Sequence, residues 1–473
     1  MINQYFPSMV VLAASIVQAL LSTFFSVLLA LPCAYFFNRF TWQRKKVLLS
    51  TVPLLCIMPS KLTGLGITLL YGLKGFTAII LAHAALNIPF AFYLFYGAYK
   101  NMNPHWHLIA QELGATRWQA YKDIDVPFLR STILSAGVII FLLCFTSFSL
   151  PQILGSAQYH MTPDILMSEY YQHEEYWMSG VYGLLRLVVL LPLCFLTSRP
   201  QNNGWLAHAM IQKRDEEYCV ARHGAGWLLL FFGVGVLTLG PLLAVLLNTI
   251  DHKVFAFFCA FFSAEPNAIL QMPCYRVVIN SVLLAAASSI AAVFFGYVLC
   301  KALQVLKSSV IKGILVLMTS GIFIVGSVGC GILFAQLAHI TYFSKFSIAV
   351  VCHLVLNYPF AYRIIKAHLG SWQSEWDLSA QSFGATSFDR VRTLELPFLR
   401  ASLIQALYIG FGLSLTEVGA GSVLKNDASM TIAGAIRLLR AHGQMDAVIG
   451  LTIILLLLVF GFTFLVGMNH KTS

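Results

Sequence analysis

Eleven apolar stretches of about 20 residues or more run through this chain of 473 residues, and each is long enough to cross a bilayer as a helix. Only 10% of the residues are charged, whereas a typical soluble domain carries about 25%. So few charges cannot cover the surface of a soluble protein of this size. We therefore predict an all-α polytopic membrane protein. The expected spans are residues 9–37, 47–72, 77–99, 132–153, 179–197, 226–248, 279–302, 311–337, 345–365, 402–423 and 445–467.

The basic residues predict how these spans are oriented, because cytoplasmic loops of membrane proteins carry an excess of Lys and Arg. By position, 21 of the 30 Lys and Arg residues fall in alternate loops, their flanking span ends and the C-terminal tail. These loops are residues 38–46, 100–131, 198–225, 303–310 and 366–401. We therefore expect the N-terminus outside and the C-terminus in the cytoplasm. The net charge of +11 then reflects topology, so we expect the lipid bilayer, and no nucleic acid, as a partner.

The first stretch and the cysteines carry no signal of processing or metal binding. The first stretch has no basic residues before it and is too long for a signal peptide, so we expect a retained helix. The ten cysteines show no metal-ligand spacing, and no metal site or cofactor is expected. Cys259 and Cys274 share an expected external loop, and the sequence leaves open whether they form a disulfide or stay as thiols.

The sequence repeats itself at an offset of 270 residues without a gap, and 22 of the 64 positions from 83 to 146 are identical to their partners. The clearest matches are 83–91 with 353–361, 114–116 with 384–386, and 127–130 with 397–400. Both copies have the same predicted orientation, which indicates two parallel pseudo-symmetric repeats. We expect a first half at residues 1–200 with five helices, a cytoplasmic linker at 201–225, and a second half at 226–473 with six.

Each half contains a matched polar loop on the predicted cytoplasmic side, about residues 104–130 and 374–400. In both, a short helix precedes a glycine turn, a capping-box pattern opens a second short amphipathic helix, and a proline is expected to interrupt the pattern before the next span. The capping residues are Thr116 with Gln119 and Thr386 with Asp389. Such loops are typical of a docking surface for a soluble partner. The alternative is a pair of interfacial helices that lie on lipid.

The residues of the two loops resemble the motif of a known family. Gly-Ala, a hydrophobic position and Val/Leu-Pro, at 114–127 and 384–397, resemble the EAA loop of binding-protein-dependent ABC importer permeases. The helices around each loop fit the core of a type I ABC importer permease, here with about 11 transmembrane helices. Two such loops in one chain resemble the fused permeases for thiamine and ferric iron, and stretches 81–89, 141–148 and 414–427 favour the thiamine type. Leu108 and Leu378 replace the glutamate of the motif, and these permeases commonly begin with one more helix.

The resemblance implies a mechanism and a set of partners. In that family the EAA loop is seated in a cleft of each of two cytoplasmic ATPase subunits, and a periplasmic binding protein delivers the solute at the bacterial inner membrane. This chain has no Walker A motif, so we expect no enzyme activity, no catalytic residue and ATP hydrolysis in a separate subunit. The implied coupling residues are Ala110, Gly114, Ala115, Trp118, Tyr121, Pro127, Ala380, Gly384, Ala385, Phe388, Val391 and Pro397.

Polar residues inside apolar spans are candidates for a translocation path, because they are costly in hydrocarbon. The candidate path residues are His83, Asn87, His353, Asn357 and Glu417. Each His and Asn pair lies four residues apart on one helix face. They can form interhelical hydrogen bonds, or the two histidines can ligate a metal ion such as iron. Glu417 suits a cationic substrate such as thiamine, or it is satisfied by the backbone or Lys425.

The expected outer segments differ in charge between the halves. Acidic residues, Asp164, Glu169, Glu174 and Glu175, follow the fourth helix of the first half, whereas Arg437 and Arg440 occupy the second. Complementary charge of this kind can orient an external binding protein, or it is ordinary solvated loop charge. Arg186 in the next span is expected to pair with a carboxylate or to extend towards the interface.

Two other function classes stay open at this point. A secondary transporter built from two parallel repeats has the same hydropathy and symmetry, but it needs no matched cytoplasmic loops. A membrane-embedded hydrolase or acyltransferase needs a nucleophile beside a base, and the His-x-x-x-Asn pairs supply none. We therefore favour the permease, with a secondary transporter as the alternative.

Overall fold

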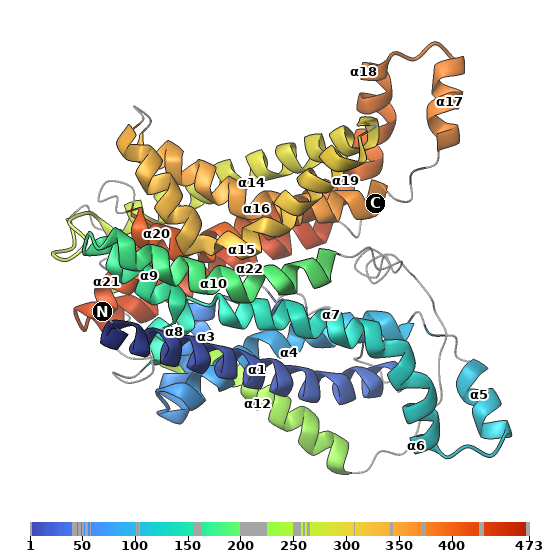
Figure 1. Ribbon diagram of the computed structural model, residues 1–473, viewed down its shortest axis with the longest axis horizontal. Coiled ribbons are helices and arrows are strands. Elements are labelled where there is room, and N and C mark those ends of the chain that lie inside the picture. The colour runs from blue at the N-terminus through green and yellow to red at the C-terminus, as the bar shows by residue number, and fades with distance from the viewer. Residues whose placement is uncertain are drawn as a thin grey trace. The chain divides into compact units, whose positions relative to one another are not determined.

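The computed structural model describes most of the chain, and all regular elements within that part are helices (Figure 1). The described ranges are residues 2–39, 58–100, 105–155, 162–198, 225–248, 265–306, 308–340, 344–369, 374–424 and 430–469, with single residues or pairs in some of the gaps. The expected linker at 201–225 lies almost wholly outside these ranges, as does Cys259.

The chain is an all-α multi-pass membrane protein. In the described ranges, nine helices are long and apolar enough to cross a membrane. They correspond to nine of the eleven expected spans. The two remaining spans are not confirmed at full length. In the span expected at 47–72, the described helix covers only Ser60–Tyr71. The helix over the span expected at 311–337 is broken at Gly326, whose φ of 62° is left-handed.

The order of helices repeats along the chain as the sequence does. The first half contains α1 (Ile2–Arg39), α3 (Ser60–Tyr71), α4 (Phe76–Lys100), α5 (His105–Glu112), α6 (Arg117–Ala120), the π-helical turn η1 (Tyr121–Asp125), α7 (Val126–Phe145), α8 (Ser149–Leu154), α9 (Pro163–Gln172) and α10 (Tyr176–Ser198). The second half contains α12 (Ala225–Leu247), α14 (Cys274–Val305), α15 (Ser309–Ile340), α16 (Lys345–Leu369), α17 (Ser374–Ser382), α18 (Ser387–Arg390), the π-helical turn η3 (Val391–Glu395), α19 (Leu396–Thr416), α20 (Gly419–Val423), α21 (Ile432–Ala441) and α22 (Met445–Asn469).

The prediction that Pro127 and Pro397 interrupt the helices is wrong. Each proline lies at the start of a long helix that continues directly from a π-helical turn. A proline inside an α-helix lacks a donor and crowds the carbonyl four residues before it. A π-helical turn, with Val126 N bonded to Tyr121 O and Leu396 N bonded to Val391 O, widens the backbone at this point. The helices of the fourth and tenth spans therefore start earlier than expected.

The chain folds as two compact units, and unit 1 comprises Met1–Leu166 and Val181–Asn248. Its main core lies between α1, α4 and α7, where Phe95, Ile140 and Phe145 are fully buried. A smaller core joins α3, α4 and α8. At one end of these helices, α5 and α6 project beyond the bundle (Figure 1).

Helix α12 packs in unit 1, against α3, although it was expected as the extra first helix of the second half. The approach is close because both helices have glycines at the contact. A Cβ atom added to Gly66 would clash with the carbonyl oxygen of Pro241, and one added to Gly240 would lie 2.8 Å from the Leu70 side chain. Small residues allow membrane helices to pack backbone to backbone in this way. The sequence-based boundaries describe the repeat and stay a prediction.

Unit 2 comprises Met167–Gly180 and Thr249–Ser473. Its helices α14, α16 and α19 enclose a core that includes Ile365 and Leu399, both fully buried. Gly296 lets α14 approach α16, since an added Cβ would lie 2.9 Å from Tyr362 N. The loop helices α17 and α18 project beyond the start of α19 (Figure 1).

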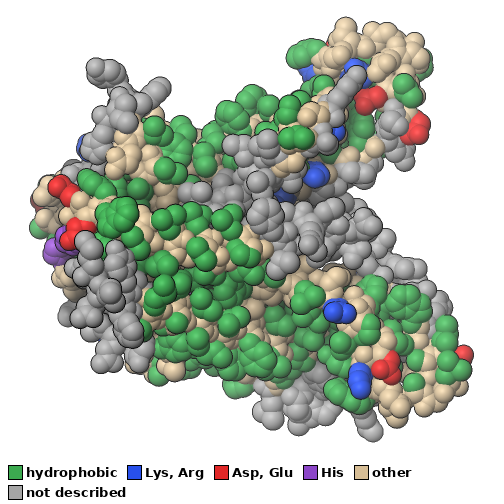
Figure 2. All heavy atoms as spheres, viewed as in Figure 1, with side chains coloured by type: hydrophobic (Ala, Val, Ile, Leu, Met, Phe, Trp, Pro, Cys, Tyr) green, Lys and Arg blue, Asp and Glu red, His purple; other side chains and the backbone are tan. Residues whose placement is uncertain are grey.

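The surface supports a membrane location for the helix bodies. On the face drawn in Figure 2, hydrophobic side chains cover the helices, and the visible charged side chains gather towards their ends. Large apolar side chains are exposed along α1 and α14, including Phe24, Leu28, Phe294 and Phe295. Apolar surface of this extent fits hydrocarbon and not water.

Candidate functional site

The glycine turn of each loop has the same hydrogen-bond pattern. The N–H of Gly114 donates to the carbonyl of Gln111 at 2.9 Å, and the N–H of Ala115 donates to that of Ala110 at 2.9 Å. The second loop repeats both bonds, from Gly384 to Gln381 at 2.9 Å and from Ala385 to Ala380 at 3.0 Å. This is the Schellman motif, in which the residue after the helix is left-handed and is usually glycine.

The glycines occupy that left-handed position, with φ of 83° at Gly114 and 79° at Gly384. No atom lies within 4 Å of a Cβ added at either position, so space does not require glycine. Backbone conformation does, because an L-residue there costs about 1–2 kcal/mol. The second hydrogen bond of each turn joins two predicted coupling positions. It runs from Ala115 to Ala110 in the first loop and from Ala385 to Ala380 in the second.

Capping boxes then open the second short helix of each loop, as predicted. Gln119 N donates to Thr116 Oγ1 at 3.3 Å, and Thr116 N donates to Gln119 Oε1 at 2.7 Å. In the second loop, Asp389 N donates to Thr386 Oγ1 at 3.2 Å, and Thr386 N donates to Asp389 Oδ2 at 3.1 Å. The cap fixes the direction of the chain after the glycine.

Both loops present large apolar side chains to their surroundings. Trp118 and Phe388 are each 70% exposed at the same register, and Leu113 and Phe383, beside the two glycines, are 83% and 90% exposed. Apolar side chains held outward by a rigid turn are a feature of partner-binding surfaces. Tyr121, which was expected among the coupling residues, is not presented outward in this way. It packs against Tyr35 of α1, with ring centroids 5.6 Å apart, and stacks with Trp118.

A tryptophan on the first loop helix packs against the membrane helix that follows. Trp106 lies edge-on to Phe128 with ring centroids 5.8 Å apart, and Trp376 lies edge-on to Phe398 at 5.5 Å. These four residues occupy equivalent positions of the repeat. Each loop therefore contacts its membrane helix through a matched aromatic pair.

The sequence analysis missed a buried carboxylate at the base of each loop. Asp125 and Glu395 are the last residues of η1 and η3, and their side chains are 0% and 8% exposed. Asp125 accepts a hydrogen bond from His107, and Glu395 from Lys301 and Tyr297. An acidic residue two positions before the proline in both copies was the signal that could have revealed them.

The His and Asn pairs lie in interhelical hydrogen bonds, one of the two interpretations left open by the sequence. His83 Nδ1 is 2.7 Å from Gln18 Nε2, and Asn87 donates to the Cys144 sulfur. All four residues are buried between α1, α4 and α7.

In unit 2, His353 Nδ1 is 2.6 Å from Ser414 Oγ, and Asn357 donates to the Gly410 carbonyl at 3.3 Å. Ser414 Oγ is also 3.0 Å from Ser288 Oγ of α14. The polar pair thus joins α14, α16 and α19. A role of these residues in a path stays a prediction.

Glu417 follows α19 and accepts hydrogen bonds from the backbone of α20. Its Oε1 is 2.6 Å from Gly419 N and 3.3 Å from Ala420 N. The carboxylate therefore satisfies donors at the start of a helix, the alternative that involved the backbone. Lys425 lies outside the described residues.

The outer acidic residues separate into a buried one and an exposed group. Asp164 is paired with Arg186, with Oδ2 3.2 Å from Nε, and both side chains are almost fully buried. Asp164 cannot face a partner protein, whereas the pairing expected for Arg186 is confirmed. Glu169, Glu174 and Glu175 are exposed.

Glu174 has a left-handed backbone, with φ of 65°. It ends a Schellman turn, since Glu174 N bonds to Tyr171 O and Glu175 N bonds to Tyr170 O. The turn after α21 uses Gly443 for this purpose. Strained residues of this kind are enriched at functional sites.

The arginines expected in the corresponding outer segment of the second half lie on α21. Burial lowers the pKa of the Arg437 and Arg440 guanidinium groups from their ordinary value, and both stay charged.

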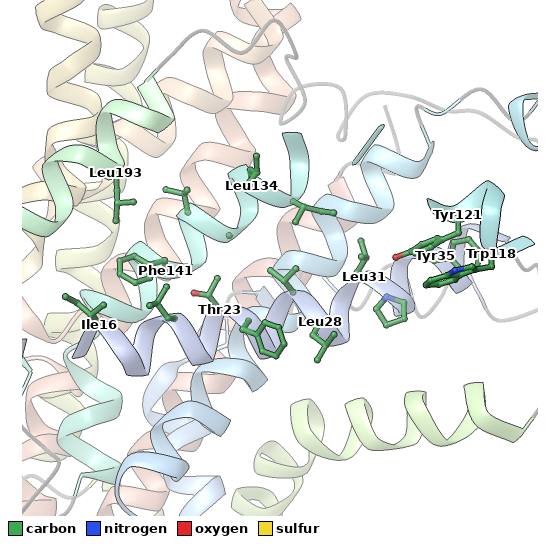
Figure 3. Close-up of a pocket in the computed structure, with 17 residues that line it drawn as sticks. Ile16, Thr23, Leu28, Leu31, Tyr35, Trp118, Tyr121, Leu134, Phe141 and Leu193 are labelled. Atoms are coloured by element: carbon green, nitrogen blue, oxygen red, sulfur yellow. The ribbon is translucent and has the colours of Figure 1, made fainter. Parts of the chain in front are cut away.

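An apolar groove of about 1030 Å³ lies on unit 1 between α1, α7 and α10 (Figure 3). Leu28 and Phe141 lie along it, and Tyr35, Trp118 and Tyr121 gather at one end. None of the predicted path residues lines this groove. Its walls offer no counter-charge, so it does not suit a charged solute.

Comparison with known proteins gives consistent relatives, although no family model matches the chain. It is 23% identical over 490 residues to the thiamine transport system permease protein ThiP of Escherichia coli K12, covering 96% of this chain and 89% of that protein. With ThiP of Haemophilus influenzae it shares 25% over 481 residues, covering 95% and 86%. A spermidine/putrescine transport system permease PotC homologue of Mycoplasma genitalium is 24% identical over 195 residues, 39% of this chain and 66% of that protein. These relatives are transport permease subunits and not enzymes.

Proposed function

We propose that this chain is the permease subunit of an ABC importer and forms the membrane path for an ATP-driven import of a small solute. Its two loops, residues 104–130 and 374–400, bind two cytoplasmic ATPase subunits. Closure of the ATPases on ATP then moves the two loops and alternates access to the path. The N-terminus lies outside and the C-terminus in the cytoplasm of a bacterial inner membrane.

The observation that supports this proposal best is the repeated geometry of the loops. The same turn and the same type of cap occur at an offset of 270 residues, and in both the exposed residues are apolar. Helices that merely lie on lipid do not require two identical rigid turns. A pair of identical ATPase subunits does require two similar surfaces, because each subunit presents the same cleft.

The solute is proposed to be thiamine or a related cation, with ferric iron as the next candidate. The basis is the name of the relatives, which are thiamine transport permeases over 86–89% of their length in the two cases above. An external binding protein delivers the solute. The exposed carboxylates Glu169, Glu174 and Glu175 are the proposed contact for one of its lobes, because they surround a rigid turn next to the exposed Trp177.

Reconstitution tests the proposal. The chain is purified with its proposed ATPase and binding-protein partners and reconstituted in proteoliposomes. Uptake of labelled thiamine is measured with ATP on the side of the membrane where the ATPase subunits lie. We expect uptake that requires ATP and the binding protein, and ATPase activity stimulated by the loaded binding protein. Ferric iron is measured in parallel.

Uptake that follows a proton or sodium gradient and ignores ATP would instead favour a secondary transporter. Failure of the ATPase subunit to co-purify with the chain would count against the loops as its binding site. Uptake of iron but not thiamine would leave the class of transporter intact and correct the solute.

A further inference from the structure

We propose that the buried carboxylate at the base of each loop, Asp125 or Glu395, is a positioning residue that ties its loop to a different element in each half. The inference rests on the proposed function, because it concerns how a loop passes movement to the membrane helices. It begins from a position that both halves share. Each carboxylate ends a π-helical turn, two residues before the proline of the following membrane helix.

In the first half, the carboxylate is tied to the loop itself. His107 Nε2 of α5 lies 2.7 Å from Asp125 Oδ1, and both residues are buried. The other oxygen, Oδ2, is buried with no hydrogen-bond partner among the described residues. Together with the contact between Trp106 and Phe128, this bond fixes α5 to the start of α7.

In the second half, the carboxylate is tied to a membrane helix. Lys301 Nζ of α14 lies 2.9 Å from Glu395 Oε2, and the Tyr297 hydroxyl donates to Oε1 at 3.2 Å. Both oxygens are therefore bonded. The repeat explains the difference, since Leu31 and Val27 stand at the positions of Lys301 and Tyr297 in the first half.

The residue equivalent to His107 is Asp377, and it has other partners. Asp377 Oδ1 is 3.3 Å from Arg390 Nη1, and its Oδ2 accepts a hydrogen bond from Trp372 Nε1 at 3.0 Å. This ion pair is half-exposed and links α17 to α18 within the loop. Exposed ion pairs contribute little to stability. The Glu395 carboxylate is buried, so we assign the main anchor of this loop to it.

The two anchors connect their loops to different sets of membrane helices. In the first half, α5 and the base of α7 form one rigid piece, so a push on the loop reaches α7 directly. In the second half, the base of α19 is joined to α14, so the same push reaches two membrane helices. Removing the partner of a buried carboxylate is strongly destabilising, because the remaining charge stays desolvated.

The test removes one partner of each anchor in the full complex of permease and ATPase subunits. We expect His107→Ala and Asp125→Asn in the first half, and Lys301→Leu in the second, to lower binding-protein-stimulated ATPase activity about tenfold. Co-purification of the ATPase subunit stays within about twofold of the unaltered protein, because the exposed surfaces are unchanged.

A rescue variant distinguishes positioning from general damage. In His107→Ala with Leu31→Lys, the new lysine occupies the position of the repeat that Lys301 holds in the second half. We expect its ammonium to bind Asp125 Oδ2, which has no hydrogen-bond partner among the described residues. We expect at least half of the lost stimulation to return. Leu31→Lys alone is the matched control and keeps its stimulation.

A distance measurement gives a second readout. Spin labels at the exposed positions Glu112 on α5 and Arg130 on α7 should keep one distance with and without ATP, and this distribution should broaden in His107→Ala and narrow again in the rescue variant. Normal stimulation in His107→Ala, or no rescue by Leu31→Lys, overturns the inference. If the unaltered protein shows no ATP-dependent transport, the proposed function fails, and the label distances still report whether His107 anchors α5.

Discussion

The two loops are alike where they face outward and different where they join the membrane helices. Gly114 and Gly384 close the same turn, and Trp118 and Phe388 are equally exposed. At the base, the first loop uses a histidine from its own helix, whereas the second uses Lys301 from α14.

This comparison separates the part of the duplicated segment that stays alike from the part that differs. The backbone of the turn depends on a few small residues, and these are identical in the two copies. A buried carboxylate only needs some cation or donor within reach, and several neighbouring helices can supply it. The outer surface thus stays common while the inner attachment diverges.

The largest effect is expected from another difference between the halves, the buried pair of Asp164 and Arg186. The second half has Gly434 and Leu456 at these positions. Asp164→Ala leaves the buried guanidinium without this partner, and we expect a loss of about 3–5 kcal/mol in stability. Thermal unfolding of the detergent-solubilised protein measures it.

The control for that pair copies the second half. Asp164→Gly with Arg186→Leu removes both charges, and we expect most of the stability to return. Asp123→Ala removes an exposed carboxylate and should change the melting temperature little. An equally large loss in the double variant would show that packing, and not charge, explains the effect.

The next effect tests the shared turn. Gly384→Val forces a β-branched residue into a left-handed backbone, so we expect binding-protein-stimulated ATPase activity to fall at least about tenfold. Gly114→Val should cause a similar loss if the loops act alike. Gly313→Val, in open space within α15 and without a left-handed φ, is the matched control. Full activity in either loop variant would remove that turn from the mechanism.

A smaller effect is expected from the exposed aromatic residues. Trp118→Ala and Phe388→Ala each remove an apolar side chain from the proposed interface, and we expect ATPase binding to weaken about five- to tenfold in each, with unchanged thermal stability. Titration of the ATPase subunit onto the permease measures the two affinities. A loss in only one variant would show that the two loops bind unequally.

The smallest effect is expected on the proposed outer face, where only the first half presents carboxylates on a strained turn. Glu174→Lys with Glu175→Lys reverses two exposed charges, and we expect about threefold more binding protein to be needed for half-maximal ATPase stimulation. The difference should shrink at high salt, because exposed charges are screened. Glu174→Asp with Glu175→Asp, which keeps both charges on the same turn, is the control. An unchanged requirement at low salt would argue against this contact.

The sequence predicted the helices well where apolar length alone decides, and less well where backbone detail does. The span near 132–153 begins earlier in the structure because Pro127 is accommodated by a π-helical turn, which no periodicity announces. The packing of α12 against α3 could not be predicted from the sequence either. The repeat indicates which half a helix resembles, and it does not indicate which helix it contacts.

Within the loops, the predictable part is local. Gly114, Thr116 and their partners lie within a few residues of one another, so their spacing suffices to predict the turn and the cap. The anchors depend on residues that the fold brings together, since Lys301 is 94 positions from Glu395. Sequence spacing alone carries no information about such a pair.

The packing of α12 bears on how this polypeptide could be divided. A fragment ending near residue 200 lacks the helix that covers α3, and a fragment beginning there carries that helix without the surface that receives it. The glycines at 66 and 240 make the two surfaces complementary at the level of the backbone. Two fragments produced together therefore have a specific reason to reassemble, and the covalent linker supplies proximity more than affinity.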